Sequence, residues 1–423
     1  MATLRYTPLN LGRWIVWGAY ALVLAAMPQL FTAGFALTLL SQMGIAVIFA
    51  LSYNMLLGQA GMLSFGHAVY SGLGAFFAIH ALNLIGRGAL AFPVTLLPLI
   101  GGAAGMLFAV IFGYPSTRRS GTTFAMISLG IGEMVFASSL MFPGFFGGEG
   151  GITTNRVAGA PFLGITYGPA VEVYYLIAAW LFACTAAMYA FTHTPLGRIA
   201  NAVRDNPERV EFIGYNTQRV RHLVMIIAGF FAGVAGSLSC LNFEIVSAEN
   251  VGAVRSGGVL IATFIGGAGF FFGPIIGAVV FTLMVTAVGT LTKAWLLYLG
   301  LLFLVMVLYA PGGFASLVLM NLQMARHGQF ARLVPRYGVA LATGLVALLG
   351  LVSAVEMGYH LSLEAGSGPE LKLFGLAVDV TSPLHWLGCA AVIAAGVSLH
   401  RAAWRQVRRE WDEGQRLIQE QLR

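Results

Sequence analysis

Polar side chains that could guide a solute gather around an interrupted apolar stretch early in the chain. They are the amides of Asn54 and Gln59, the hydroxyls of Ser64 and Ser71, and the imidazole of His67. Hydrogen-bonding groups inside apolar segments either line a substrate path or join packed helices. Both interpretations stay open for the amides and hydroxyls. A lone histidine in such a place is more often a hydrogen-bonded core residue than a ligand.

An acidic residue, Glu133, lies in the middle of another apolar stretch. An ionisable group there usually faces a cavity, a partner or a substrate path, although a hydrogen bond to a neighbouring helix explains it equally well. We expect Glu133 to be buried and to line a path together with residues 59–71. An intramembrane enzyme built on His67 or Glu133 is an alternative, but the sequence offers neither residue a recognisable nucleophile or metal partner.

The sequence shows no motif for binding ATP. A phosphate-binding P-loop ends in Gly-Lys-Ser/Thr, whereas the two lysines, Lys293 and Lys372, do not follow glycine. We therefore expect no cofactor and no metal in this chain; if ATP is used, a partner binds it together with Mg²⁺. Cys184, Cys240 and Cys389 all fall in apolar runs, so no disulfide framework is predicted.

The composition indicates an integral membrane protein. Charged residues make up 9% of the chain and hydrophobic residues 58%, and the mean hydropathy is +0.83, whereas soluble domains carry about 25% charged residues. Apolar segments predict about twelve membrane-spanning helices of roughly 20 residues each. The expected spans cover residues 14–30, 34–57, 67–85, 92–114, 122–142, 171–191, 223–241, 256–270, 272–290, 294–310, 337–357 and 383–399.

Basic residues predict how these spans are oriented. The net charge of +7 lies mostly in loops, which is typical of an orientation signal rather than of a nucleic-acid surface. With both termini in the cytoplasm and the first helix uncleaved, every large basic loop falls inside. The basic residues then expected outside are Arg87, Arg156, Arg255, Lys293 and Lys372.

The segment 193–222 is the longest charged stretch between apolar spans. Asn206 is suited to cap a short helix that begins at Pro207 and ends at Gly214. In such a helix Val210 and Ile213 would share one face, because they are three residues apart. An exposed amphipathic helix between spans indicates a docking surface, and the alternative is a solvated spacer.

Two glycine-rich segments interrupt the helical pattern in similar ways. They cover residues 58–76 and 266–281, one in each half of the core. Paired interruptions are typical of internally repeated transporters, although glycine is common in all packed membrane helices. The candidate hinge residues are Gly58, Gly61, Gly66, Gly266, Gly267, Gly269, Gly273 and Pro274.

Several motifs, in order over about residues 40–310, resemble the permease subunits of branched-chain amino-acid ABC importers. The sister type with the longer chain is the one that this sequence resembles. One motif is the segment GQAGMLSFGHA at residues 58–68, and another is the glycine loop at 147–152. The segment from Gly266 to Gly277 matches a third motif. The remaining matches are Arg119, Gly121, Phe124, Ala125, Leu129, Gly130 and Glu133, followed by Gly197, Arg198, Ala202, Arg204, Asp205, Asn206 and Gly214.

The resemblance implies partner subunits, some of which bind ATP in place of this chain. It implies a homologous sister permease, two cytoplasmic ATPase subunits that bind ATP and Mg²⁺, and a periplasmic or other external binding protein, in a bacterial cytoplasmic (inner) membrane. A cytoplasmic permease helix docks on the ATPase in that family. The resemblance thus assigns ATPase coupling to Arg198, Arg204, Asp205, Asn206, Glu211 and Gly214.

Two features depart from the family pattern. Thr122 or Thr123 replaces a tyrosine of the motif, and the two spans beyond about Met324 have no usual counterpart. Similar systems carry urea, short amides or aromatic acids, so these substrates stay open beside branched-chain amino acids. A self-sufficient carrier is a further alternative, which the lack of intramembrane acids disfavours. A structural scaffold would not need two glycine-broken spans.

The expected fold class is therefore an all-α polytopic membrane protein with pseudo-repeated halves. A permease core of about ten spans occupies residues 1–320, with the coupling loop at 193–222. A basic cytoplasmic linker follows at 321–336, then a two-helix transmembrane appendage at 337–400 and a basic cytoplasmic tail at 401–423.

Overall fold

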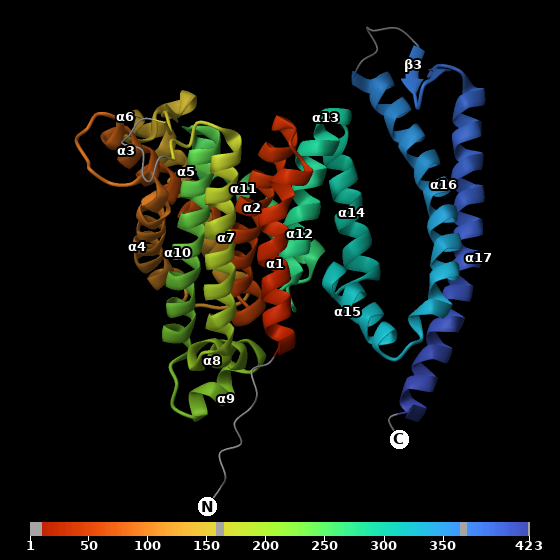
Figure 1. The fold of residues 1–423 in the computed structure, drawn as a ribbon, viewed down its shortest axis with the longest axis horizontal. Helices are drawn as coiled ribbons and strands as arrows, with labels where there is room; N and C mark the ends of the chain where they lie inside the picture. The colour runs from red at the N-terminus through yellow and green to blue at the C-terminus, as the bar shows by residue number, and fades with distance from the viewer. Residues whose placement is uncertain (1–10, 158–164, 364–369, 422–423) are drawn as a thin grey trace, which may run out of the picture. The chain divides into compact units, whose positions relative to one another are not determined.

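The computed structural model describes residues 11–157, 165–363 and 370–421, and these are mostly helical (Figure 1). Among them, nine helices are long and apolar enough to cross a membrane, or up to ten if the bent pair α14 (Trp295–Tyr309) and α15 (Gly313–Arg326) forms one span. The expected all-α polytopic fold is confirmed. The first ten residues and the last two, which belong to the predicted cytoplasmic termini, lie outside the described residues.

The chain divides into two compact units. The first comprises Met1–Val288 and Leu301–Ala315, and the second Gly289–Gly300 and Ser316–Arg423. The long helices of the first unit are α1 (Leu11–Leu30), α2 (Gly34–Asn54), α3 (Ala68–Gly86), α4 (Leu97–Ser116), α5 (Thr122–Met141), α7 (Ala170–His193) and α10 (Thr217–Phe243). Its shorter elements are η1 (Met55–Gln59), η2 (Val94–Leu96), α6 (Pro143–Phe146), η3 (Gly148–Gly150), β1 (Ile152–Thr153), α8 (Pro195–Asp205), α9 (Pro207–Phe212), β2 (Ile245–Val246), η4 (Ala248–Val251), α11 (Ala253–Gly266), α12 (Gly273–Thr282) and η5 (Leu283–Val288).

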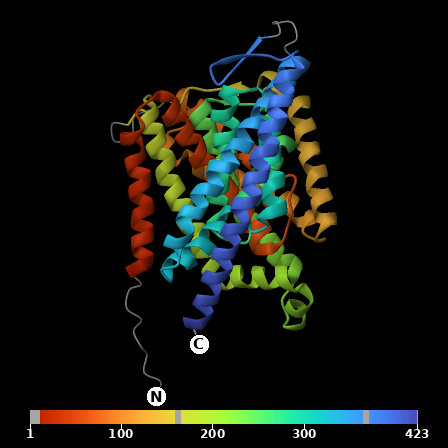
Figure 2. The same ribbon diagram turned by 90° about the vertical axis from the view of Figure 1, so that its right-hand side faces the viewer.

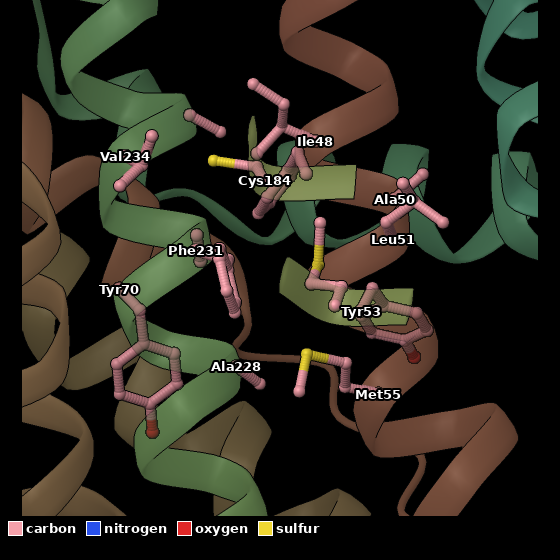
Figure 3. Close-up of a cluster of buried hydrophobic side chains, with 14 of the residues drawn as sticks. Ile48, Ala50, Leu51, Tyr53, Met55, Tyr70, Cys184, Ala228, Phe231 and Val234 are labelled. Carbon is pink, nitrogen blue, oxygen red and sulfur yellow. The ribbon is translucent and has the colours of Figure 1, made fainter. Parts of the chain in front are cut away.

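Helix α10 forms the centre of the first unit, where it packs against α2, α3 and α4. Apolar side chains from α2, α3, α7 and α10 meet there, among them Ile48, Tyr53, Tyr70 and Phe231 (Figure 3). Small residues let the backbones of neighbouring helices approach closely. Membrane helices depend on such close packing, because the hydrophobic effect does not drive them together. Gly236 of α10, for example, lies against the backbone of Ser71 in α3.

Adding a methyl group at this contact is expected to destabilise the protein. A Cβ at Gly236 would collide with the carbonyl oxygen of Ser71, which is backbone and cannot rotate away. Overpacking of this kind costs about 1–3 kcal/mol. Gly236→Ala should therefore lower the Tm of the purified protein in detergent. Gly130→Ala is the matched control, because its Cβ would have no atom within 4 Å; equal Tm values for the two variants would contradict the close packing.

The second unit contains α13 (Gly289–Leu291), α16 (Phe330–Leu363), β3 (Glu370–Leu373), β4 (Leu376–Asp379) and α17 (Pro383–Gln421). Helices α16 and α17 run side by side (Figures 1 and 2). Strands β3 and β4 form an antiparallel hairpin whose turn residues Phe374 and Gly375 both have positive φ. That conformation is the one a two-residue hairpin turn favours.

One acidic side chain of α16 joins elements of the second unit. Glu356 accepts hydrogen bonds from the hydroxyls of Thr292, at 2.7 Å, and Tyr298, at 2.8 Å. A carboxylate in an apolar helix is stabilised by such donors. This contact fixes α16 to the segment that precedes residue 301.

Each expected span falls on a helix, but several lengths differ from the expectation. Helices over Trp14–Leu30 and Ala253–Gly266 are shorter than the helices that could cross a membrane. The expected linker at 321–336 is helical apart from residues 327–329, and α17 continues through residue 400 into the tail. Apolar composition does not fix where a helix ends, because ends depend on capping and packing. The proposed domain limits stay a prediction.

Candidate translocation path and coupling segment

The first glycine-rich interruption is a break between α2 and α3. Helix α2 passes into the π-helical turn η1, and no helix continues until Ala68. Gly61 has a φ of +66°, which a residue with a side chain rarely adopts. Gly66 lies against the backbone of Ser128 in α5, so a side chain there would not fit. The break is therefore built into the backbone.

The polar residues predicted to line a path gather at this break. Asn54 is 2% exposed, and Ser64, His67 and Ser71 are completely buried. The Nε2 atom of His67 lies 2.9 Å from the hydroxyl of Ser52. Gln59 is half-buried at the end of η1. The structure thus brings five of the six predicted path residues to one region.

Many of these polar atoms have no hydrogen-bond partner in the described part of the chain. Buried polar groups are nearly always paired with protein or water, so a cluster of unpaired ones needs a cause. Water or a passing solute would supply the missing partners. The unpaired atoms are Tyr53 Oη, Asn54 Oδ1, Gln59 Oε1, Ser64 Oγ, His67 Nδ1 and Ser71 Oγ. Their role in a path stays a prediction.

The expectation that Glu133 is buried is wrong, because the structure places it on the exposed side of α5. Its neighbour Gly132 faces the protein interior and lies beside Gly66. Apolar neighbours in the sequence do not bury a residue when its helix has only one packed face. An exposed carboxylate in a span faces a partner subunit or a path rather than lipid.

The second interruption lies between α11 and α12. Gly266 ends α11, Gly267 follows with a φ of +107°, and Gly273 and Pro274 begin α12. Gly269 lies in the intervening turn with open space around it. This turn reaches the first interruption, since the carbonyl oxygen of Ala268 lies against Gly58. The two broken segments are therefore in contact.

The charged segment between α7 and α10 forms two helices, α8 and α9, beyond one end of the bundle (Figures 1 and 2). Asn206 caps α9 by accepting a hydrogen bond from the Arg209 amide at 3.0 Å. Gly214 has a φ of +91° just after the helix ends. The short helix predicted between Asn206 and Gly214 is confirmed. Glu211 accepts a hydrogen bond from Thr217 at 2.7 Å, which ties α9 to the start of α10.

The prediction that Val210 and Ile213 share one face is wrong. Val210 is 3% exposed, whereas Ile213 is 70% exposed and its neighbour Phe212 is 90% exposed. Ile213 lies past the last residue of α9, so the three-residue spacing of a continuous helix does not apply to it. Two apolar side chains consequently project from the end of the segment.

Arg204 connects this segment to the first break. Its guanidinium donates a hydrogen bond to the carbonyl oxygen of Gly58, and its stem lies against Gly61. It also pairs with Asp205, with a distance of 2.9 Å between Nε and Oδ1. Arg198, Asp205 and Asn206 are exposed. A movement of α8 would therefore act directly on the backbone of η1.

Neither helix α8 nor the position of Arg255 within a helix was predicted from the sequence. Thr194 caps α8, and Pro195 stands at its first position, a pattern that predicts a helix start. Arg255, expected in an outer loop, lies inside α11 with its guanidinium carbon 5.8 Å from the centre of the Phe49 ring. The apolar run that follows Arg255 is the signal that could have placed it in a helix.

Comparison with known proteins identifies the family. Residues 35–311 match the family described as branched-chain amino acid transport system / permease component. The match ends before α16 and α17 begin. No solved structure matches the chain.

Three curated relatives show how broad the similarity is. The high-affinity branched-chain amino acid transport system permease protein LivM of Escherichia coli (strain K12) is 27% identical over 293 residues, 64% of this chain and 67% of the relative. BraD of Pseudomonas aeruginosa, with the same description, is 22% identical over 240 residues, 54% and 77% of the two chains. The fructose import permease protein FrcC of Rhizobium meliloti is 27% identical over 244 residues, 51% and 62%. Since the family match covers more than half of the 423 residues, the chain belongs to the permease components of branched-chain amino acid ABC transport systems.

Proposed function

We propose that this chain is one of two homologous permease subunits of an importer for branched-chain or related amino acids. Two ATPase subunits, which bind ATP and Mg²⁺, would power it from the cytoplasm, and an external binding protein would deliver the substrate. The chain would lie in the bacterial inner membrane with both termini in the cytoplasm. It would transport rather than catalyse a reaction.

The observation that carries this proposal is the α8–α9 segment. It lies beyond one end of the bundle and presents Phe212 and Ile213 to solvent. Two exposed apolar side chains at the end of α9 suit a pocket on a partner. Arg204 then links the same segment to Gly58 in the broken helix. This arrangement supports a coupling role for α8 and α9.

The glycine breaks support movement of the path between two states. Alternating access needs rigid parts that rock about a few backbone positions. Gly61 and Gly267 have positive φ, and the two breaks touch through Gly58 and Ala268. A pull on α8 would be transmitted through Arg204 to both breaks at once.

The substrate class rests on the relatives. LivM and BraD are named for branched-chain amino acids, whereas FrcC is named for fructose import. The similarity therefore extends to a carrier of a neutral solute. A neutral solute such as a sugar, urea or an amide is the second candidate for this chain.

The test is reconstitution of the complete transporter in proteoliposomes. The chain is produced with the sister permease, ATPases and binding protein encoded beside it, and uptake of radiolabelled leucine is measured with ATP inside. We expect uptake that requires ATP and the ATPases. Uptake by this chain alone under an ion gradient would instead identify a self-sufficient carrier. ATP-driven uptake of urea or fructose without leucine uptake would assign the second candidate.

A further inference from the structure

Helix α11 begins deep inside the bundle rather than at its surface. Strand β2 precedes α11 and pairs with β1. This pair lies near the C-terminal end of α3, where the Asn83 side chain donates a hydrogen bond to the carbonyl oxygen of Thr153. Asn250 and Val251 then lie against Gly72. Gly72 is roughly 16 Å from Asn83 along α3, at about 1.5 Å per residue. The chain therefore turns back into the bundle before α11 starts.

Contacts at the start of α11 give its depth. The Ser256 hydroxyl accepts a hydrogen bond from the Ala68 amide at 3.0 Å, and Arg255 lies over the Phe49 ring. At about 1.5 Å per residue, Phe49 is roughly 22 Å from Gly34 and roughly 15 Å from Gln59, the two ends of the α2–η1 helix. Helix α11 thus starts near the middle of the span, and it is a half-helix.

A second helix starts at the same depth. Helix α3 begins at Ala68, directly after the first break, and His67 before it stacks on Phe49 with ring centres 5.4 Å apart. The starts of α3 and α11 meet in the bond between Ala68 and Ser256. The first amides of α3 are already paired, with Ser256, Gly66 and His67, so this helix contributes its partial positive charge rather than free donors. Two helix N-termini at one point create a region that attracts an anion.

Arg255 adds a full positive charge to this region. Its guanidinium, which stays protonated in proteins, has no hydrogen bond or ion pair with any of the described residues. Arg255 is partly buried, and an unpaired charge at this depth of a membrane protein requires a partner. The Nδ1 atom of the completely buried His67 also has no partner. Val254, next to Arg255, is 92% exposed, so this end of α11 is open to the outside of the chain.

We propose that Arg255, together with the meeting N-termini of α3 and α11, binds the carboxylate of the transported solute midway through the membrane. Arginine pairs with a carboxylate through two parallel hydrogen bonds, which orients the solute as well as attracting it. The Phe49 ring, whose centre lies 5.8 Å from the guanidinium carbon, offers a cation–π contact that helps to hold the group in place. The exposed end of α11 leaves room for the solute to reach the guanidinium from the side of Val254.

This assignment rests on the proposed import function and specifies its substrate class. A carboxylate-bearing solute gains from Arg255, whereas urea or a sugar has no charge to pair with it. The two N-termini also explain why an arginine is tolerated there without an acidic neighbour in the chain: the transported carboxylate is the missing partner. The site would bind weakly, since the solute must leave again.

Arg255→Gln removes the charge while keeping a side chain that can form hydrogen bonds. In the reconstituted transporter we expect ATP-driven leucine uptake to fall by roughly tenfold or more, as loss of a charged hydrogen bond predicts. Arg255→Lys should retain part of the uptake, because it keeps the charge. If the proposed import function is wrong, the unmodified transporter will not take up leucine. If only the carboxylate site is wrong, the unmodified transporter will take up leucine and Arg255→Gln will do so equally well.

A binding measurement separates recognition from folding and from the rest of the transport cycle. Val254→Cys, in a chain with Cys389→Ser, is labelled with a maleimide in the assembled complex. Isovalerate, a branched carboxylate without an amine, should slow labelling, whereas isoamylamine, the matching amine without a carboxylate, should not. Adding Arg255→Gln should remove the protection by isovalerate.

Four results would overturn the proposal. One is unchanged leucine uptake by Arg255→Gln. Another is equal protection by isovalerate and isoamylamine. The third is protection by isovalerate that persists without Arg255. If Arg255→Gln loses the sister permease on purification while isovalerate never protects, Arg255 pairs with that subunit instead, which also contradicts the proposal. Co-purification of all subunits and an unchanged Tm confirm that the variant is folded.

Discussion

Replacing Phe212 and Ile213 together by alanine is expected to abolish ATP-driven leucine uptake while leaving this chain folded. The two side chains are 90% and 70% exposed in the isolated chain, so their loss removes little internal packing. If they fill a pocket on the ATPase, each contributes about 1.5–3 kcal/mol of burial to the complex. That loss would lower the affinity by at least tenfold for each residue.

The measurement is co-purification of the ATPase with tagged permease, followed by uptake in proteoliposomes. Phe142→Ala is the matched control, because Phe142 is also apolar and 61% exposed but follows α5 rather than α9. ATPase recovery with the double variant equal to that of the control would show that α9 is only a spacer. A lower Tm of the double variant would instead assign these residues to the fold.

The second large effect is expected at Arg204, which joins α8 to the first helix break. Arg204→Met keeps an unbranched stem against Gly61 but removes the donor to the Gly58 carbonyl. The Arg204 side chain is 37% exposed, so solvent screens the bond, and its loss should cost about 1 kcal/mol of stability. We expect the ATPase to stay bound and active while leucine transported per ATP falls roughly tenfold.

Arg219→Met provides the control for Arg204, because Arg219 is also an exposed arginine but lies at the start of α10, outside α8 and α9. Its ratio of transported leucine to hydrolysed ATP should match that of the unmodified chain. The coupling role of Arg204 is refuted if the two variants give the same ratio. Loss of the ATPase from the Arg204 variant would indicate a docking role instead.

The local features that the sequence predicts correctly depend on neighbours in the chain. Apolar runs longer than about 18 residues predict most of the helices, since spanning a bilayer requires them. Asn206, Pro207 and Gly214 predict α9, because a cap, a fixed φ and a positive φ are local requirements. The glycine clusters likewise mark both breaks, and the motifs that contain them indicate the family.

Other features follow from contacts between distant segments. The exposure of Glu133 depends on which face of α5 is packed, and that of Ile213 on where α9 ends. Arg255 lies at the middle of the span because the chain after β2 turns back between helices. No periodicity within α11 reports that turn.

The sequence by itself determined most of the membrane-spanning helices, the capped helix α9, the two breaks and the family. Tertiary structure alone decided that both breaks touch, that Arg204 reaches Gly58, and that the start of α11, which carries Arg255, meets the start of α3. The physical reason is the distance along the chain over which each interaction acts. Propensity, capping and hydrophobicity act over a few residues, whereas a site formed by residues 49, 67 and 255 exists only after close packing brings those segments together.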